Sequence, residues 1–382
     1  MSDEIGVLIV DDSAMMRNLI GRMVEDTPGL VIAEKAMNGV FALQKIPRVN
    51  PDIIILDLEM PEMNGIEFLQ ERKKRGIKVP VVILSSIAEK GAKITMEALS
   101  LGANDFIQKP SGSVSMDIHT VRDTLIPMLF GYGGAYRRSQ GRKVLSPNEY
   151  PKKSAAPTPE AVHPDITAHF SYTPQTAEPA KPPTPLRRPA KTEIIAIGIS
   201  TGGPDALRVV FSQLDNDLKV PIVVVQHMPP GFTYEFAKSL DRICPMDVKE
   251  AEEGDAIQEG RILIAQGNKH LEVARKGLGG IVHLTDSPQV SGHRPSADVL
   301  FASVAIAYQN RALGVIMTGM GRDGAAQLGN IYKEGGMTLG QDEKTAVVYG
   351  MPRVAYELGH VMEQVSLENM ARRICDVAKA NR

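Results

Sequence analysis

The chain has 382 residues, of which 43% are hydrophobic and 23% are charged, and its formal net charge is −2. These values exclude global disorder and argue against a chain-wide basic surface for binding nucleic acid. The chain has two cysteines, no apolar run near the roughly 18 residues that span a bilayer, and an acidic start unlike a signal peptide; we therefore expect a soluble, cytoplasmic protein without direct membrane insertion.

A change in composition near residue 140 divides the chain. Residues 145–190 contain 11 of the 26 prolines, mixed with Ala, Thr, Ser and Lys. Such a segment buries little apolar area and favours extended backbone. We therefore predict one domain over residues 1–138, a proline-rich linker over 139–190 and a second domain over 191–382.

The first domain is predicted to alternate strands and helices. In chain order, the expected strands are Val7–Val10, Val31–Ala33, Ile53–Leu56, Val81–Leu84 and Phe106–Gln108, and the expected helices are Met15–Val24, Val40–Ile46 and Ile66–Arg75. Continuous apolar strands that alternate with helices indicate a parallel sheet covered on both faces. Ligands of such sheets bind at the carboxyl ends of the strands.

The second domain repeats this pattern and adds a hairpin. The expected strands are Ile194–Ile199, Ile222–Val225, Arg261–Ile264 and Leu313–Thr318, and the expected helices are Ala206–Phe211, Thr233–Leu240 and Asp298–Gln309. Leu271–Ala274 and Ile281–Thr285 flank a glycine-rich turn, which is typical of an antiparallel β-hairpin. The predicted fold class is therefore α/β, with two doubly wound domains.

Polar side chains gather at the strand ends of the first domain. Asp11, Asp12, Asp57 and Lys109 end or follow three of the expected strands, and Ser85 follows a fourth. Because these ends share one sheet edge, the groups can converge, and clustered carboxylates suit Mg²⁺. A dication and a lysine are what a transferring phosphoryl group requires. Asp57 is the expected nucleophile, because it stands alone at the end of the central strand, and Ser85 could donate a hydrogen bond to the acyl phosphate.

Four motifs in residues 5–130 resemble a response-regulator receiver domain. They are IVDDS (Ile9–Ser13), LDLEMPEMNG (Leu56–Gly65), LSS (Leu84–Ser86) and QKP (Gln108–Pro110). The resemblance implies a flavodoxin-like fold and phosphorylation of Asp57 by a histidine kinase.

The same resemblance implies roles for the neighbouring groups. Mg²⁺ would be held by Asp12, Asp57 and the backbone carbonyl of Glu59. Asp11 would assist from outside this ligand set or through water. As further implications of the resemblance, Lys109 would contact the phosphoryl group, and Ser85 would report it to the surface.

A second candidate nucleophile, Ser200, lies in a G-x-S-x-G motif over Gly198–Gly202. The motif follows an expected strand and precedes a helix, and small neighbours allow a sharp turn that exposes the hydroxyl. The alternative is a loop that cradles a phosphate on backbone N–H groups. Neither a Walker lysine nor a G-x-G-x-x-G motif follows, which disfavours this alternative.

A serine nucleophile needs a base and an acid that orients it. The candidate bases are His227, which ends the next strand, His293 as a weaker choice, His270 at the site rim, and His283 and His360. Asp323, in a glycine-rich loop after another strand, is the candidate acid, although it could instead cap a helix or a turn. The order serine, histidine, acid differs from that of α/β-hydrolases.

Four long motifs of the second domain resemble the chemotaxis protein-glutamate methylesterases, the CheB family. They are GISTGGP (Gly198–Pro204), VVVQHMPPGF (Val223–Phe232), GHRPSADVLF (Gly292–Phe301) and MTGMGRDGA (Met317–Ala325). A receiver followed by this domain is that family's arrangement. The resemblance implies a Rossmann-like catalytic domain that hydrolyses glutamate γ-methyl esters on methyl-accepting chemoreceptors and deamidates selected glutamines, with no cofactor for the esterase chemistry.

The family's site residues carry over to this sequence as implications of the resemblance. Ser200, His227 and Asp323 would be nucleophile, base and orienting acid. Met320 would donate a backbone N–H to the oxyanion, and Thr201 would assist near the nucleophile. The unphosphorylated receiver is expected to cover the catalytic pocket. The alternatives are a second domain that only binds a partner, an esterase for small diffusible esters and, least favoured, a DNA-binding output.

Overall fold

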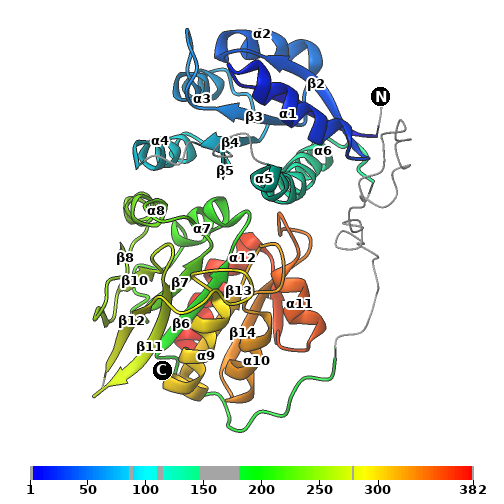
Figure 1. The fold of residues 1–382 in the computed structure, drawn as a ribbon. Helices are drawn as coiled ribbons and strands as arrows, with labels where there is room; N and C mark the ends of the chain where they lie inside the picture. The colour runs from blue at the N-terminus through cyan, green and yellow to red at the C-terminus, as the bar shows by residue number, and fades with distance from the viewer. Residues whose placement is uncertain (1–2, 86–88, 110–114, 146–179, 278, 381–382) are drawn as a thin grey trace. The chain divides into compact units, whose positions relative to one another are not determined.

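The protein folds into two compact α/β units, each with its own parallel sheet (Figure 1). The computed structural model describes residues 3–85, 89–109, 115–145, 180–277 and 279–380. The linker predicted over 139–190 lies largely outside the described residues, so the domain boundaries stay predictions. Each helix and strand below lies in the described part of the chain.

The first unit is built on a five-stranded parallel sheet with the order β2-β1-β3-β4-β5. Its strands are β1 (Ile5–Val10), β2 (Leu30–Ala36), β3 (Ile53–Asp57), β4 (Val81–Ser85) and β5 (Asp105–Gln108). The helices of this part of the chain are α1 (Ala14–Glu25), α2 (Gly39–Val49), α3 (Gly65–Lys74), α4 (Glu89–Ser100) and α5 (Ser115–Met128). This strand order is flavodoxin-like, as expected.

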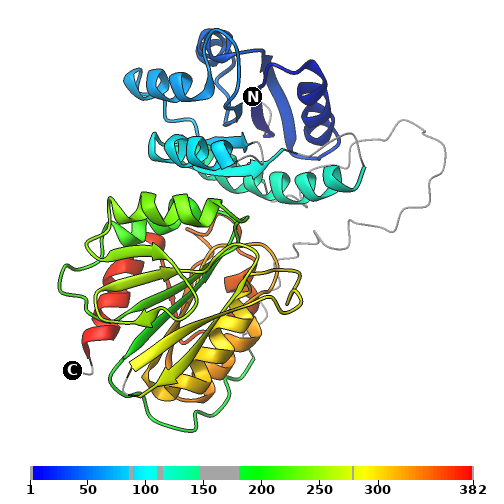
Figure 2. The ribbon, with the colours of Figure 1, turned by 60° about the vertical axis from the view of Figure 1, so that its left-hand side comes forward.

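Local sequence explains why the helices begin where they do. The Ser13 side chain caps α1 by accepting a hydrogen bond from Met16 N–H, and Asn64 forms a capping box with Glu67 at the start of α3. The helix α1 packs against α5, and α2 packs against α3 (Figure 2). The caps therefore fix the start of α1, which follows the short loop after β1, and the start of α3, which follows the loop after β3.

A helical extension follows α5. A π-helical turn (Leu129–Gly133) continues into α6 (Gly134–Ser139). Arg137 Nη1 lies 2.9 Å from Asp52 Oδ2, and Arg142 pairs with the same buried carboxylate. These ion pairs attach the extension to the start of β3.

The second unit contains a seven-stranded parallel sheet with the order β15-β14-β13-β6-β7-β10-β8. The strands are β6 (Ile194–Ile199), β7 (Ile222–Gln226), β8 (Asp247–Glu250), β10 (Arg261–Ile264), β13 (Ala312–Ile316), β14 (Met337–Gln341) and β15 (Glu363–Val365). Beside it lies a three-stranded antiparallel sheet of β9 (Ala256–Ile257), β11 (His270–Lys276) and β12 (Gly279–Thr285). The predicted mainly parallel sheet and added hairpin are confirmed.

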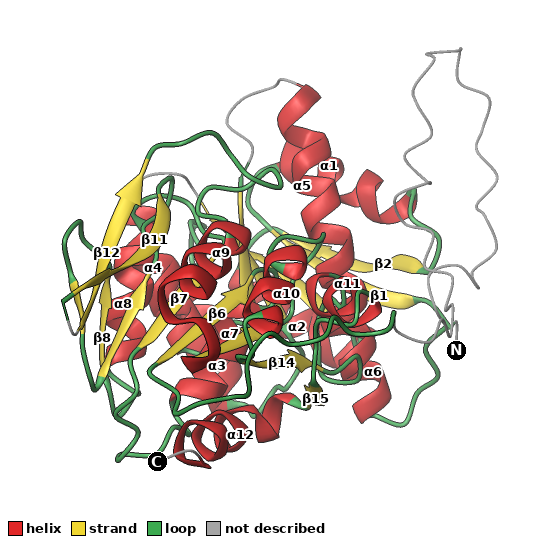
Figure 3. Cartoon of the chain, turned by 90° about the horizontal axis from the view of Figure 1, so that it is seen from below, coloured by secondary structure: helices red, strands yellow, loops and turns green. Residues whose placement is uncertain are grey.

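Helices cover both faces of the seven-stranded sheet (Figure 3). They are α7 (Gly203–Phe211), α8 (Phe232–Asp241), α9 (Ala297–Tyr308), α10 (Ala325–Lys333), α11 (Met351–Glu357) and α12 (Leu367–Ala380). Contacts join α7 to α8 and α12, and α10 to α9 and α11. The core between them is apolar, and Phe211, Phe236 and Phe301 are each completely buried in it.

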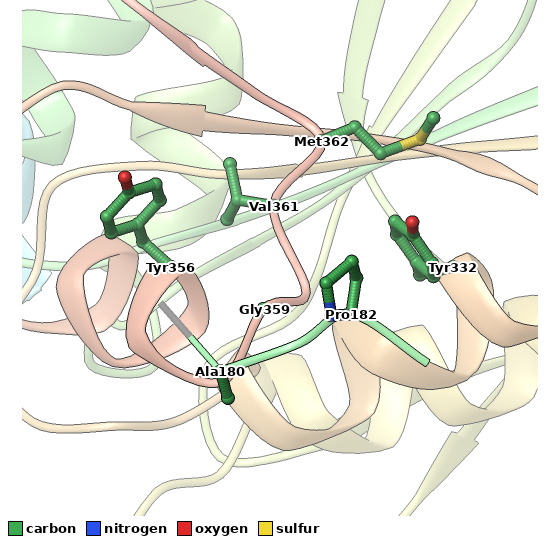
Figure 4. Close-up of a pocket in the computed structure, with 7 residues that line it drawn as sticks. All are labelled: Ala180, Pro182, Tyr332, Tyr356, Gly359, Val361 and Met362. Carbon is green, nitrogen blue, oxygen red and sulfur yellow. The ribbon is translucent and has the colours of Figure 1, made fainter. Parts of the chain in front are cut away.

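Residues 180–193 run along the second unit. Backbone N–H groups of Ala180, Leu186 and Ala190 donate to carbonyls of Glu357, Lys333 and Asn310. A pocket of about 240 Å³ lies between this segment, α10, α11 and the loop after α11, and Figure 4 shows the side chains that line it. Its lining is mostly apolar and includes two tyrosines; the residues are Ala180, Pro182, Tyr332, Tyr356, Gly359, Val361 and Met362.

Candidate functional sites

Three loops at one edge of the seven-stranded sheet bring Ser200, His227 and Asp323 together. The loops follow β6, β7 and β13, and β6 lies between the other two strands. His227 Nδ1 lies 3.0 Å from Ser200 Oγ, and His227 Nε2 lies 2.7 Å from Asp323 Oδ2. Ser200 is 8% exposed and Asp323 is 1% exposed. The arrangement can therefore pass a proton from a serine hydroxyl to an imidazole that a buried carboxylate orients.

The two ring nitrogens of His227 have distinct roles. An ionised carboxylate only accepts hydrogen bonds, so the nitrogen facing Asp323, Nε2, carries the ring proton. The other nitrogen, Nδ1, is then free to accept the proton of Ser200 Oγ. A general base needs this tautomer.

The carboxylate of Asp323 is held at the start of α9. Ser296 Oγ donates to Asp323 Oδ1 at 2.6 Å, and Ala297 N–H donates to Oδ2 at 2.6 Å. Burial alone would raise the pKa of Asp323, but the hydrogen bonds and the charge interaction with His227 outweigh it and lower that pKa. The acid therefore stays ionised at neutral pH. It does not cap α10, whose N-cap residue is Gly324.

The backbone of the nucleophile loop is fixed from both neighbouring strands. Ser200 N–H donates to Thr318 O at 2.9 Å, and Thr318 Oγ1 donates to Thr201 O at 2.8 Å. From the other side, Gln226 Nε2 donates to the carbonyls of Ser200, at 3.0 Å, and of His227, at 3.1 Å. One buried amide therefore ties the peptide of the serine to the peptide of the base.

Gly319 brings a peptide bond close to the serine. A Cβ atom at this position would lie 2.8 Å from Ser200 Cβ, which is too close for any side chain. The Gly319 carbonyl accepts a hydrogen bond from Met351 N–H at 2.9 Å. Because a trans peptide points its N–H opposite to its carbonyl, the N–H of Met320 points away from α11. This fixed N–H is a candidate oxyanion donor.

Three of the five candidate histidines have partners outside this group. His270 is fully buried, and its Nε2 lies 3.0 Å from Pro288 O, so it holds the loop after β12 and does not line the rim of the site. His283 Nδ1 lies 2.9 Å from Glu253 Oε1, and His360 Nδ1 lies 2.9 Å from Ala325 O. Neither histidine contacts Ser200 or Asp323 through these nitrogens.

The remaining histidine, His293, lies on the ring of His227. The two ring centroids are 3.8 Å apart and the ring planes differ by 15°. Burial, with a further contribution from His227, lowers the pKa of His293 to about 4. This histidine is therefore uncharged at neutral pH and occupies the face of the base, not its hydrogen-bonding edge.

In the first unit, the carboxylates expected at the sheet edge converge. Oxygen atoms of Asp11, Asp12 and Asp57 all lie within 4.8 Å of one another. Lys109 Nζ lies 2.6 Å from Asp57 Oδ2 and 3.3 Å from Asp11 Oδ2. Three hard oxygen donors so close together fit a Mg²⁺ ion.

Electrostatics at this edge are unfavourable for the carboxylates alone. Burial raises the pKa of Asp57, and the nearby charge of Asp11 adds to the effect. Burial alone would lower the pKa of Lys109, but its contacts with Asp57 and Asp11 raise it. Glu59 N–H donates to Asp57 Oδ1 at 3.2 Å, and Ser85 is buried at the end of β4. A cation among these groups would offset the cost of the buried negative charge.

Several residues that shape the second site were not predicted from the sequence. Ser296 and Ala297 hold the acid, and Gln226 and Thr318 hold the nucleophile loop. Ser296 is the N-cap residue of α9 and Ala297 is its first residue, and a serine that follows a polar loop and precedes an apolar run is an N-cap pattern. That pattern could have indicated a helix start facing the site.

Comparisons with known proteins identify a family for each part of the chain. Residues 195–374 match the family model described as CheB methylesterase, and residues 7–118 match the response regulator receiver domain. The chain is 60% identical to a protein-glutamate methylesterase/protein-glutamine glutaminase of Treponema denticola, over 97% of this chain and 98% of the relative. A protein of the same description from Treponema pallidum is 50% identical, over 98% and 97% of the two chains.

A solved structure is also similar to part of the chain. The CheB methylesterase catalytic domain of Thermotoga maritima is 34% identical and covers 49% of this chain and 98% of its own length, with a TM-score of 0.48.

Within the described part of this chain, every helix is too short or too polar to cross a membrane.

Proposed function

The chain belongs to the CheB family of protein-glutamate methylesterases/protein-glutamine glutaminases, and from this we propose that it demethylates glutamate γ-methyl esters on methyl-accepting chemoreceptors. We also propose that it deamidates selected receptor glutamines and thereby supports adaptation in chemotaxis. The observation that carries the proposal is the chain of two hydrogen bonds from Ser200 through His227 to Asp323.

The proposed reaction proceeds through an acyl-enzyme. Ser200 Oγ attacks the side-chain carbonyl while His227 Nδ1 takes the hydroxyl proton. Asp323 holds the ring through Nε2 and stabilises the imidazolium that forms. The backbone N–H of Met320 would donate to the oxyanion, with Thr201 supporting the loop from its neighbouring position.

Collapse of this intermediate expels the leaving group. Methanol, or ammonia from a glutamine, leaves with the proton that His227 returns. Water then attacks the acyl-enzyme carbonyl, His227 takes its proton, and Ser200 leaves as the hydroxyl. The products are the glutamate carboxylate and the free enzyme, and this chemistry needs no cofactor.

We propose that the first unit is a receiver whose phosphorylation on Asp57, by a histidine kinase, activates the esterase. Mg²⁺ would be held by Asp12, Asp57 and the backbone carbonyl of Glu59, and it would neutralise charge on the phosphoryl group. Asp11 would act on this ion indirectly. The proposed Mg²⁺ site is supported by the carboxylates of Asp11, Asp12 and Asp57, whose oxygen atoms lie close to one another.

Two further groups of the receiver complete this proposal. Lys109 would contact the phosphoryl group from its position beside Asp57, and Ser85 would report phosphorylation to the surface. The proposed domain division is 1–138 for the receiver, 139–190 for the linker and 191–382 for the catalytic domain.

The direct test measures methanol released from methyl-esterified chemoreceptor membranes. We expect Ser200→Ala to lower the rate by about 10⁴-fold or more, because the nucleophile is lost. Near-normal release by Ser200→Ala would contradict the serine mechanism. Equal activity on free methyl esters would instead favour an esterase for small diffusible substrates, the alternative that Ser200, His227 and Asp323 also allow.

A further inference from the structure

The imidazole of the base is held along its edge by the two hydrogen bonds and on its face by His293. The lone pair and the N–H bond of an imidazole lie in the plane of its ring, so the contacts of His227 Nδ1 with Ser200 and of Nε2 with Asp323 act along the edge of the ring. They limit rotation within that plane but restrain tilting much less. The parallel ring of His293, 3.8 Å away, opposes this tilt and keeps water from one face of the base.

The loop that carries His293 is anchored independently of His227. Arg294 Nη2 donates to Asn268 Oδ1 at 2.8 Å, and Arg294 Nη1 donates to the carbonyls of Asp286, at 2.7 Å, and of Ser287, at 3.0 Å. These partners flank the hairpin of β11 and β12. The antiparallel hairpin therefore supports the loop from outside the parallel sheet.

The same loop continues into the support of the acid. Ser296 N–H donates to His270 Nδ1 at 3.2 Å, and Ser296 Oγ donates to Asp323 Oδ1. Four consecutive residues, 293–296, thus contact both the base and its orienting acid. A shift of this loop would move both partners of the proton transfer together.

The charge of His293 suits such a role. The charged or titratable groups that act on it are His227 and Asp323. Its ring is uncharged at neutral pH, since burial and His227 lower its pKa to about 4. An uncharged aromatic face attracts a stacked cation, whereas a second positive charge would oppose protonation of His227.

We propose that His293 is a positioning residue for the esterase reaction: its stacked ring aligns His227 Nδ1 on Ser200 Oγ and stabilises the imidazolium that forms as the serine attacks. This inference rests on the function proposed above. It differs from a role as an alternative base, because His293 stacks on the ring of the base while His227 contacts both Ser200 and Asp323.

The test uses the full chain, activated with Mg²⁺ and a small-molecule phosphodonor, and measures kcat and KM for methanol release. We expect His293→Ala to lower kcat about 10–100-fold with KM within about twofold, because small misalignments of reacting groups are costly. His293→Phe keeps a flat ring and should stay within about fivefold of the wild type. His293→Leu keeps bulk without a flat ring and should resemble His293→Ala.

Matched controls separate this inference from a general loss of structure. His283→Ala removes an exposed histidine paired with Glu253, and it should leave kcat unchanged. Thermal unfolding of each variant reports whether it is folded. If His293→Ala does not fold, the comparison of His293→Phe with His293→Leu decides, because both retain a large apolar side chain.

The outcomes distinguish the two proposals. Wild-type kcat in His293→Ala, or equal rescue by Phe and Leu, would overturn the positioning role while the esterase function stands. Absence of methanol release from the wild type, or undiminished release from Ser200→Ala measured beside it, would overturn the proposed function itself.

Discussion

Asp57 and Asp323 are both almost fully buried carboxylates at the carboxyl edge of a parallel sheet, yet their pKa values shift in opposite directions. Burial raises the pKa of Asp57, and the neighbouring carboxylate of Asp11 adds to that shift. Burial alone would also raise the pKa of Asp323, but the contacts with His227, Ser296 and Ala297 reverse the direction. The two pKa values differ because more hydrogen-bond donors surround Asp323 than Asp57, and not because the two side chains are buried to different extents.

This contrast separates two kinds of site. Hydrogen-bond donors of the protein itself already surround Asp323, so this carboxylate is preorganised beside His227. Around Asp57, negative charge is brought together with one lysine as a counter-charge, which leaves room for an external cation and a phosphoryl group. A preorganised site suits repeated catalysis, whereas an unbalanced site suits a switch whose ligands change its state.

The largest expected effect tests whether the carboxylate of Asp323 orients His227. Asp323→Asn should lower kcat for methanol release by about 10³–10⁴-fold, because an amide does not enforce the required tautomer of His227. Asp298→Asn is the control, since this buried acid accepts from Gln327 and Ser291 and is not bonded to His227. Equal losses in the two variants would show that the acid acts only through packing.

The next prediction tests the unbalanced site. Mg²⁺ at 100 times its Kd should stabilise the first unit by about 2.7 kcal/mol, because the ion binds the folded carboxylate cluster. We expect thermal unfolding to show this shift in the wild type and in Asp323→Asn but not in Asp12→Asn. A full Mg²⁺ shift in Asp12→Asn would contradict the proposed ligand set.

A packing prediction concerns the support of the nucleophile. A Cβ at Gly203 would lie 1.8 Å from Gln226 Oε1, so Gly203→Ala must displace the amide that ties Ser200 to His227. We expect a loss of about 1–3 kcal/mol in unfolding free energy together with reduced kcat. Gly279→Ala is the control, because its nearest neighbour would be 3.9 Å away. Equal unfolding free energies of the two variants in chemical denaturation would show that the Gln226 amide does not hold the loops of Ser200 and His227 together.

The smallest effect is a pH dependence of stability. Because the folded pKa of Asp323 lies below its unfolded value of about 3.9, its contribution is complete above that value and is lost as pH falls through the folded pKa. The wild type should therefore lose more stability below about pH 4 than Asp323→Asn does. Urea unfolding of both proteins between neutral pH and pH 3 measures this difference, and parallel curves would argue against a depressed pKa.

The positions of the functional residues at the ends of strands could be predicted from the sequence. Asp57 and Ser200 each follow a continuous apolar run, so their sheet edge could be inferred before any contact was known. The short strands β8 and β15 were not predicted, because Asp247–Glu250 and Glu363–Val365 mix charged and apolar residues at the sheet edges.

Contacts between distant loops explain what the sequence could not show. His293 was considered only as a weaker base, because stacking on His227 depends on how two loops meet in space. The partnership of Ser296 with Asp323 likewise joins residues 27 positions apart. Nor does a motif reveal that Nδ1, rather than Nε2, of the base faces the serine.

The most direct test of the account couples the two sites. Methanol release from methyl-esterified chemoreceptor membranes is measured with and without Mg²⁺ plus a small phosphodonor, in the wild type and in Asp57→Asn and Ser200→Ala. We predict release that rises with the phosphodonor in the wild type, stays at its basal rate in Asp57→Asn and is abolished in Ser200→Ala. Wild-type release that is the same with and without the phosphodonor would contradict control of the triad by phosphorylation of Asp57.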